Sequence, residues 1–327
     1  MLPGFRNFRC RLRALFHPDM YHGWGKKRNY FEGWYFKIVD ATEQYAFAFI
    51  PGISFDAGGR AHAFIQVMDG KKKSAVYHDF PAQAFVPDAD FFHLNLDKNQ
   101  FSASGFSLDL PAVQGNISFR NTTPWPKMLG APGVMGWFSF VPLMECKHGV
   151  VSLFHRLEGG LTINGDYIDF SGGIGYVEKD WGQSFPAAYI WLQCNHFNTA
   201  EPISLMTSVA KIPYAGTYFI GFLVGFYFDN KLYRFATYTG EGRTTRIDGQ
   251  TVYLTFQSGK NRLEITATQS PGTDLISPLP HGMAGKVNES LEATVELQFY
   301  KNGKLVFSDT GRNAGMEIAG SVQELEK

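Results

Sequence analysis

Residues 291–309 read LEATVELQFYKNGKLVFSD, and this stretch decides the fold class. Apolar and polar side chains alternate before Asn302-Gly303, and a second apolar run follows this dipeptide. Asn-Gly tolerates positive φ at both central positions of a type I′ turn, which joins antiparallel strands tightly. Alternation around such a turn is typical of a β-hairpin with one buried face. The stretch therefore predicts two paired antiparallel strands.

The same pattern recurs along the chain. Asp69-Gly70, Asn164-Gly165 and Ser258-Gly259 each separate two strand-like runs. Residues 34–106 and 189–268 share one order of elements: a Trp-bearing strand, a strand that ends near proline, a hairpin and a polar-tipped hairpin. We therefore predict an all-β protein of two tandem antiparallel barrel or sandwich domains with few short helices. The expected division is a basic N-terminal arm (1–29), a first β domain (30–175) and a second (176–327).

The composition supports this interpretation. The chain has 327 residues, of which 44% are hydrophobic and 16% aromatic, together with 35 Gly and 16 Pro. Such a chain is too apolar for disorder and too rich in helix breakers for long helices. Residues 316–327 alone resemble a short helix. The charge-free run 212–228 is interrupted by glycines, which favours two core strands over a membrane span.

Charge and motifs exclude several function classes. Lys and Arg total 30, as do Asp and Glu, so the chain lacks the basic excess of a nucleic-acid-binding protein. Cys10, Cys146 and Cys194 form no zinc-ligand pattern, and their scatter favours a reducing, cytoplasmic compartment. No nucleotide-binding, metalloprotease or nucleophile-elbow motif occurs. We therefore expect neither a metal nor another cofactor.

The N-terminal arm allows two interpretations. Residues 1–18 contain Arg6, Arg9, Arg11 and Arg13 among Phe and Leu, and they contain no acidic residue. No apolar secretory segment follows this basic start. The arm either packs on the first domain or makes weak peripheral contact with an anionic membrane surface.

Three segments place ionisable groups among aromatic residues, which suits proton-driven chemistry in an apolar cavity. On a strand, Glu32 shares a face with Trp34, Phe36 and Ile38, so we expect burial to raise its pKa. Glu178 and Asp180 share a face of another strand, while Lys179 points away from both. His281 precedes a strand in the third segment.

These segments carry a family resemblance. HPDMYHG (17–23), FEGWYFK (31–37), EKDWGQSFPAAYIWLQCNHF (178–197) and HGMAGKVNESL (281–291) resemble the tocopherol cyclase-like family. The resemblance implies two lipocalin-like β domains, as in more distant carotenoid hydratases. It also implies the activity of the plant members, which close the chromanol ring of a phytyl-tailed hydroquinol.

Three functions remain open on this basis. The first is an acid-promoted addition of a phenolic O–H to a prenyl double bond, with Glu32, Glu178 or Asp180 as the acid and His281 as an aid to the phenol. The second is a non-catalytic carrier of a prenylated quinone, carotenoid or other lipid, and the third is an isoprenoid hydratase or isomerase. Each needs a hydrophobic small molecule as ligand. The expected substrate-binding residues are Trp34, Tyr35, Trp181, Trp191, Asn195 and Phe197.

Overall fold

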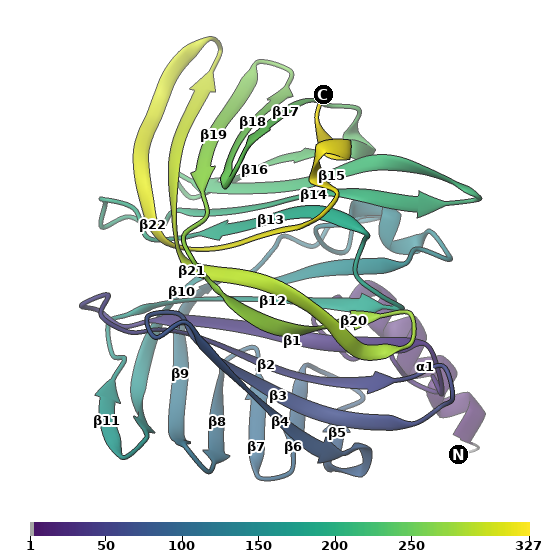
Figure 1. Cartoon of the computed structure of the whole chain (residues 1–327). Helices are drawn as coiled ribbons and strands as arrows, with labels where there is room; N and C mark the ends of the chain where they lie inside the picture. Colours follow the sequence, from purple (N-terminus) through teal and green to yellow (C-terminus); the bar gives the residue numbers. More distant parts are fainter. Residues whose placement is uncertain (1–2) are drawn as a thin grey trace. The chain divides into compact units, whose positions relative to one another are not determined.

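The computed structural model describes residues 3–327 and consists mainly of antiparallel strands that form two large curved sheets (Figure 1). By its internal contacts the chain divides into two compact units. The first contains residues up to Asp69, Ala75–Phe185 and Ile276–Lys286, and the second contains Gly70–Ser74, Pro186–Leu275 and Val287–Lys327. The units therefore interleave along the sequence rather than meet at one boundary after residue 175.

Within the described residues, the first sheet has twelve strands in the order β4-β3-β2-β1-β12-β10-β9-β8-β7-β6-β5, with β11 paired to β10. Its strands are β1 (Tyr30–Val39), β2 (Ala46–Phe55), β3 (Ala61–Asp69), β4 (Ser74–Pro81), β5 (Phe85–Pro87), β6 (His93–Leu96), β7 (Asn99–Ser102), β8 (Gly105–Leu110), β9 (Val113–Thr123), β10 (Cys146–Ile163), β11 (Asp166–Asp169) and β12 (Ile174–Gly182). Two short 3₁₀ helices, η1 (Ala82–Ala84) and η2 (Gly136–Phe140), interrupt the order.

The first sheet curls around an aromatic core. Trp34 of β1 stacks on Phe92 at a ring distance of 5.2 Å, and Phe36 lies 5.4 Å from Phe101 of β7 and 5.7 Å from Phe106 of β8. These rings lie far apart in the strand order, so only a strongly curved sheet brings them together. Large aromatic side chains bury much apolar surface, which stabilises such a closed form.

The second sheet has ten strands among the described residues, in the order β16-β15-β14-β13-β22-β21-β19-β18-β17, with β20 paired to β21. Its strands are β13 (Ala188–Cys194), β14 (Ser204–Tyr214), β15 (Thr217–Phe228), β16 (Lys231–Ala236), β17 (Gly242–Asp248), β18 (Thr251–Ser258), β19 (Asn261–Thr268), β20 (Thr273–Leu279), β21 (Gly282–Lys301) and β22 (Lys304–Gly320), with 3₁₀ helices η3 (Thr237–Thr239) and η4 (Val322–Leu325). Phe235 of β16 lies 6.3 Å from Phe256 of β18, so this sheet curls as well.

The expectation of an all-β chain with antiparallel sheets and few short helices is confirmed. Asn302 and Gly303 have φ values of 53° and 75°, as the hairpin turn between β21 and β22 requires. The charge-free run 212–228 forms most of the β14–β15 hairpin, as expected. The described helices include none long and apolar enough to cross a membrane.

Two local expectations need correction. Of the stretch 316–327 expected to be helical, only Val322–Leu325 forms a short 3₁₀ helix. Residues 316–320 continue strand β22 instead, because Met316 and Ile318 pair with Leu192 and Ile190 of β13. Pairing with a core strand thus overrides the local helical preference. The second correction concerns residues 176–182, which belong to the first sheet, since β12 pairs with β1 and β10.

The N-terminal arm begins with helix α1 (Pro3–Phe16), while Met1 and Leu2 lie outside the described residues. Cys10 and Ala14 are buried on the inner side of α1. His22 reaches this helix through its ring Nε2, which lies 3.0 Å from the carbonyl oxygen of Ala14. The helix therefore packs on the first unit with one face.

Candidate functional site

Strand β12 sends two sets of side chains to opposite faces of the first sheet. Val177 and Trp181 enter the aromatic core, so the alternation of a strand turns Glu178 and Asp180 to the other face. There Glu178 lies between Tyr35 of β1 and Val150 of β10, its partners in the strand register. The sequence placed the two carboxylates on one face correctly.

His148 of β10 lies opposite Asp180 and joins the two carboxylates. Its Nδ1 lies 2.8 Å from Oδ1 of Asp180, and its Nε2 forms an ion pair at 3.2 Å with Oε2 of Glu178. The hydroxyl of Tyr176 donates a hydrogen bond of 2.5 Å to the same oxygen of Glu178. We call these four residues the acid cluster.

The two carboxylates of the acid cluster differ in their exposure to water. The side chain of Glu178 is 5% exposed, whereas that of Asp180 is 28% exposed. Burial lowers the pKa of His148, but the charges of Glu178 and then Asp180 raise it more, and the pKa lies well above its ordinary value. An imidazolium held between two carboxylates can pass a proton from the exposed side to the buried side.

The same ligand atoms lie within 4.8 Å of one another, and one imidazole with two carboxylates is a known ligand set for metals. However, both ring nitrogens of His148 already face a carboxylate. To bind a metal, one ring nitrogen would have to lose its proton and give up its contact with the carboxylate. The geometry therefore fits a protonated imidazole better than a metal ligand.

We expect His148 to stay protonated through neutral pH. Because its folded pKa is raised, the stability it contributes is fully present below the unfolded pKa of about 6.5 and is lost as pH rises through the folded pKa. Its imidazole ¹⁵N resonances should stay constant between about pH 6 and pH 8. The resonances that disappear in His148→Gln are those of His148. A titration midpoint of these resonances near pH 6.5 would contradict the expectation.

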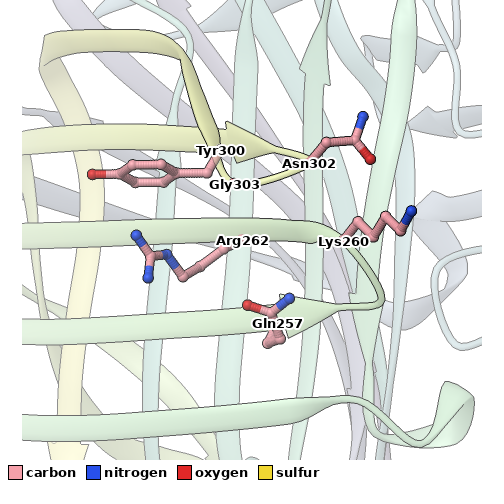
Figure 2. A pocket seen from close by; sticks show the side chains of 6 residues that line it. All are labelled: Gln257, Lys260, Arg262, Tyr300, Asn302 and Gly303. Atoms are coloured by element: carbon pink, nitrogen blue, oxygen red, sulfur yellow. The ribbon is translucent and has the colours of Figure 1, made fainter.

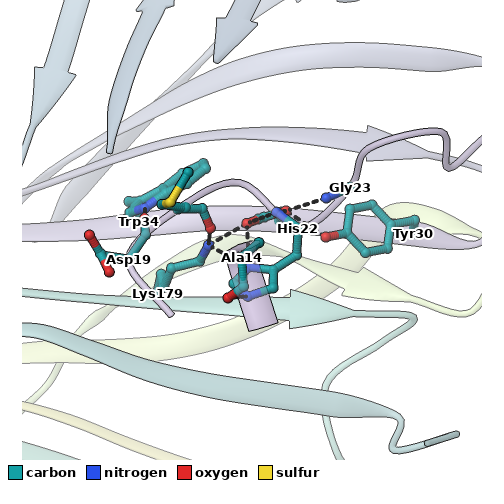
Figure 3. Close-up of polar contacts among 9 residues, drawn as sticks. Ala14, Asp19, His22, Gly23, Tyr30, Trp34 and Lys179 are labelled. Carbon is teal, nitrogen blue, oxygen red and sulfur yellow. Dashed lines mark hydrogen bonds and ion pairs between the residues drawn. The ribbon is translucent and has the colours of Figure 1, made fainter. Parts of the chain in front are cut away.

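The core-facing side of β1 and β12 holds a second group of charges (Figure 3). The ammonium of Lys179 forms an ion pair with Glu32, and both side chains are fully buried. Glu32 also accepts hydrogen bonds from the backbone N–H of His22 and Gly23 and from the Tyr30 hydroxyl, the last at 2.5 Å. We call this group the buried lock.

Aromatic rings enclose the buried lock. The Nζ of Lys179 lies 4.3 Å from the ring centre of Trp34 and 4.8 Å from that of Trp181. It also donates a hydrogen bond of 2.5 Å to the carbonyl of Met20. The His22 ring stacks on Trp181 at 4.1 Å. These contacts tie residues 20–23 to the two strands.

The expectation that Glu32 is a neutral acid is wrong. Burial raises the pKa of Glu32, but the charge of Lys179 and the hydrogen bond from His22 outweigh it, and the pKa lies below its ordinary value. Burial lowers the pKa of Lys179, and the charge of Glu32 opposes this shift. The pair is ionised at neutral pH, because the Met20 carbonyl and two indole faces also stabilise the ammonium.

The other predicted site residues are divided between the two faces of the first sheet and the second unit. Trp34 and Trp181 face the core and touch the buried lock, while Tyr35 shares the face of Glu178. Trp191 and Asn195 are buried at β13 in the second unit, and Phe197 lies in the core of that unit. His281 is exposed in the turn between β20 and β21.

A pocket of about 460 Å³ lies in the second unit, lined by Gln257, Lys260, Arg262, Tyr300, Asn302 and Gly303 (Figure 2). None of the predicted site residues lines it. Arg262 lies over the Tyr300 ring at 4.2 Å and pairs with Glu264 at 3.1 Å. These polar and charged walls are unsuited to a prenyl chain, which needs an apolar lining.

Sequence reasoning missed His148, Tyr176, His22 and Lys179 as members of these groups. Tyr176 could have been found, because it alternates with Glu178 and Asp180 along one strand. His22 lies within the HPDMYHG motif. His148 had no such signal, since its strand β10 meets β12 only through the tertiary pairing.

Comparisons with known proteins agree with this fold. A model of the family described as tocopherol cyclase-like matches residues 111–320. The "Probable tocopherol cyclase, chloroplastic" of Oryza sativa subsp. japonica is 24% identical over 95% of this chain and 80% of its own length. The "Tocopherol cyclase, chloroplastic" of Zea mays is 24% identical over 94% of this chain and 78% of its own.

Two solved structures share the fold at low identity. CghA crystallised with Sch210972 has a TM-score of 0.56 at 14% identity, with 89% of each chain covered. Kievitone hydratase from Nectria haematococca has a TM-score of 0.50 at 13% identity, covering 90% of this chain and 89% of its own. At these identities the likeness concerns the fold alone.

Proposed function

Because the chain belongs to the tocopherol cyclase-like family, we propose that it is an enzyme that adds a phenolic O–H across a prenyl double bond. The product would be a chromanol, and the substrate a hydrophobic prenylated hydroquinol. The observation that carries this proposal is the acid cluster, in which a nearly buried carboxyl group has a path for protons from a more exposed one. Glu178 is the proposed catalytic residue.

The proposed reaction begins with proton transfer. The carboxylic acid form of Glu178 gives its proton to the less substituted alkene carbon, and a tertiary cation forms. The phenol oxygen attacks this cation, and the phenolic proton is released. One C–H and one C–O bond form while the alkene π bond and an O–H bond break, so the reaction is an isomerisation that consumes no co-reactant.

The other members of the acid cluster would supply and hold the proton. Nε2 of the His148 imidazolium, 3.2 Å from Glu178, gives its proton to that carboxylate, while the more exposed Asp180 holds the Nδ1–H until the ring regains a proton from water. The Tyr176 hydroxyl fixes the orientation of the Glu178 carboxyl group. Tyr35, the register partner of Glu178, is the proposed aromatic neighbour of the developing cation.

A reaction in deuterated water tests the proposal. Purified protein is mixed with a phytyl- or prenyl-hydroquinol, and the product is analysed by mass spectrometry and NMR. We expect a chromanol with a single deuterium on the former alkene carbon, because the added proton originates from solvent.

The other functions predict different products. A tertiary alcohol, heavier by one water, would indicate that water captures the cation and that the protein is a hydratase. Recovery of bound, unchanged hydroquinol would contradict the enzymatic proposal and favour the lipid carrier.

A further inference from the structure

The outer face of α1 is apolar and open. At about 100° per residue, one side of this helix carries four large apolar side chains, those of Phe5, Phe8, Leu12 and Phe16. Their exposed fractions lie between 48% and 63%. The buried Cys10 and Ala14 lie on the opposite side. The helix thus packs on the first unit with small side chains and exposes its large apolar ones. Such a face is unusual on a surface that contacts only water.

Arginine residues flank this apolar face on both edges. Arg6, Arg9 and Arg13 follow one edge and Arg11 follows the other, while residues 3–16 contain no acidic side chain. Asp90 is an acidic group beside this edge, where it lies 3.7 Å from Arg9. The whole chain has a formal net charge of zero, so this helix concentrates positive charge locally.

A second segment of the first unit extends the apolar face. The ring of Phe140 lies 5.6 Å from that of Phe16. We call Phe5, Phe8, Leu12, Phe16 and Phe140 the apolar surface.

We propose that the apolar surface docks onto an anionic lipid bilayer. Its large apolar side chains would enter the interface between headgroups and acyl chains, and the flanking arginines would contact the headgroups. A second copy of the chain fits less well, because a two-fold contact would bring the arginines of both copies together. Docking through the apolar surface does not require the acid cluster. A prenylated substrate would itself dissolve in such a bilayer.

Vesicle sedimentation tests this proposal with the full chain. Wild-type protein should bind vesicles of phosphatidylcholine mixed with phosphatidylglycerol, bind pure phosphatidylcholine vesicles much more weakly, and dissociate as salt is raised. Phe8→Ser with Leu12→Ser should weaken binding by at least about tenfold, because two anchoring side chains are lost. Arg6→Gln should weaken it about fivefold on anionic vesicles only.

Leu305→Ser with Val306→Ser is the matched control, since both residues are exposed on β22 of the second unit. These substitutions should leave vesicle binding unchanged. The proposal is overturned if wild-type protein does not bind anionic vesicles, or if the α1 variant binds as well as wild type. It is also overturned if ultracentrifugation shows a dimer that the α1 variant abolishes while neither protein binds vesicles.

Discussion

Replacing Glu178 by Gln is expected to lower the rate of chromanol formation by about 10²–10⁴-fold, the usual contribution of a general acid. The amide keeps the shape of the side chain and can still accept the hydrogen bond from Tyr176. It cannot donate a proton to an alkene. Circular dichroism and the unfolding midpoint should therefore change little while single-turnover rates fall.

Variants of the neighbouring residues separate the catalytic role from positioning roles. Asp180→Asn should slow the reaction less and change its pH profile, because the route for reprotonation is altered. Glu158→Gln is a matched control on β10, where the side chain is exposed and pairs with Arg120. The assignment is wrong if Glu178→Gln keeps the wild-type rate, and it moves to Asp180 if Asp180→Asn alone abolishes turnover.

The second large effect concerns stability. Lys179→Met should reduce the free energy of unfolding by about 3–5 kcal/mol, because it leaves the buried Glu32 carboxylate without its counter-charge. Urea unfolding followed by tryptophan fluorescence measures the change. Adding Glu32→Gln to Lys179→Met should recover part of the loss, since a neutral amide oxygen can still accept the N–H groups of His22 and Gly23.

The buried lock also predicts an acid limb in the stability profile. The folded pKa of Glu32 is lowered, so its contribution is present above the unfolded pKa of about 4.3 and is lost as pH falls through the folded pKa. Glu32→Gln should remove this part of the acid dependence. A Lys179→Met protein within about 1 kcal/mol of wild type would show that the pair does not stabilise the fold.

Much of the fold could be predicted because the signals are local. Turn dipeptides such as Asn302-Gly303 fix the hairpins through backbone conformation alone. Strand alternation also placed Glu178 and Asp180 on one face. These inferences require only neighbouring residues.

The partners of the ionisable groups could not be predicted in this way. Alternation put Glu32 among apolar side chains correctly, but its environment depends on β12, which follows β1 much later in the chain. The HPDMYHG, FEGWYFK and EKDWG motifs all contribute to the buried lock, so part of what looked like a catalytic pattern is a structural one. A sequence pattern identifies special residues without stating whether they bind protons, substrate or one another.

The two charged residues of the buried lock lie far apart in the sequence, and this has a consequence for synthesis on the ribosome. Glu32 and Lys179 are 147 positions apart, and at ordinary translation rates this interval lasts about 7–30 s. During that time β1 can pair with β2, but its other edge lacks β12 and its carboxylate lacks an ammonium partner. An open strand edge of this kind can pair with other chains. The nascent chain is therefore most vulnerable to aggregation between the emergence of β1 and that of β12, and chaperones that cover emerging strands should raise the yield of native protein.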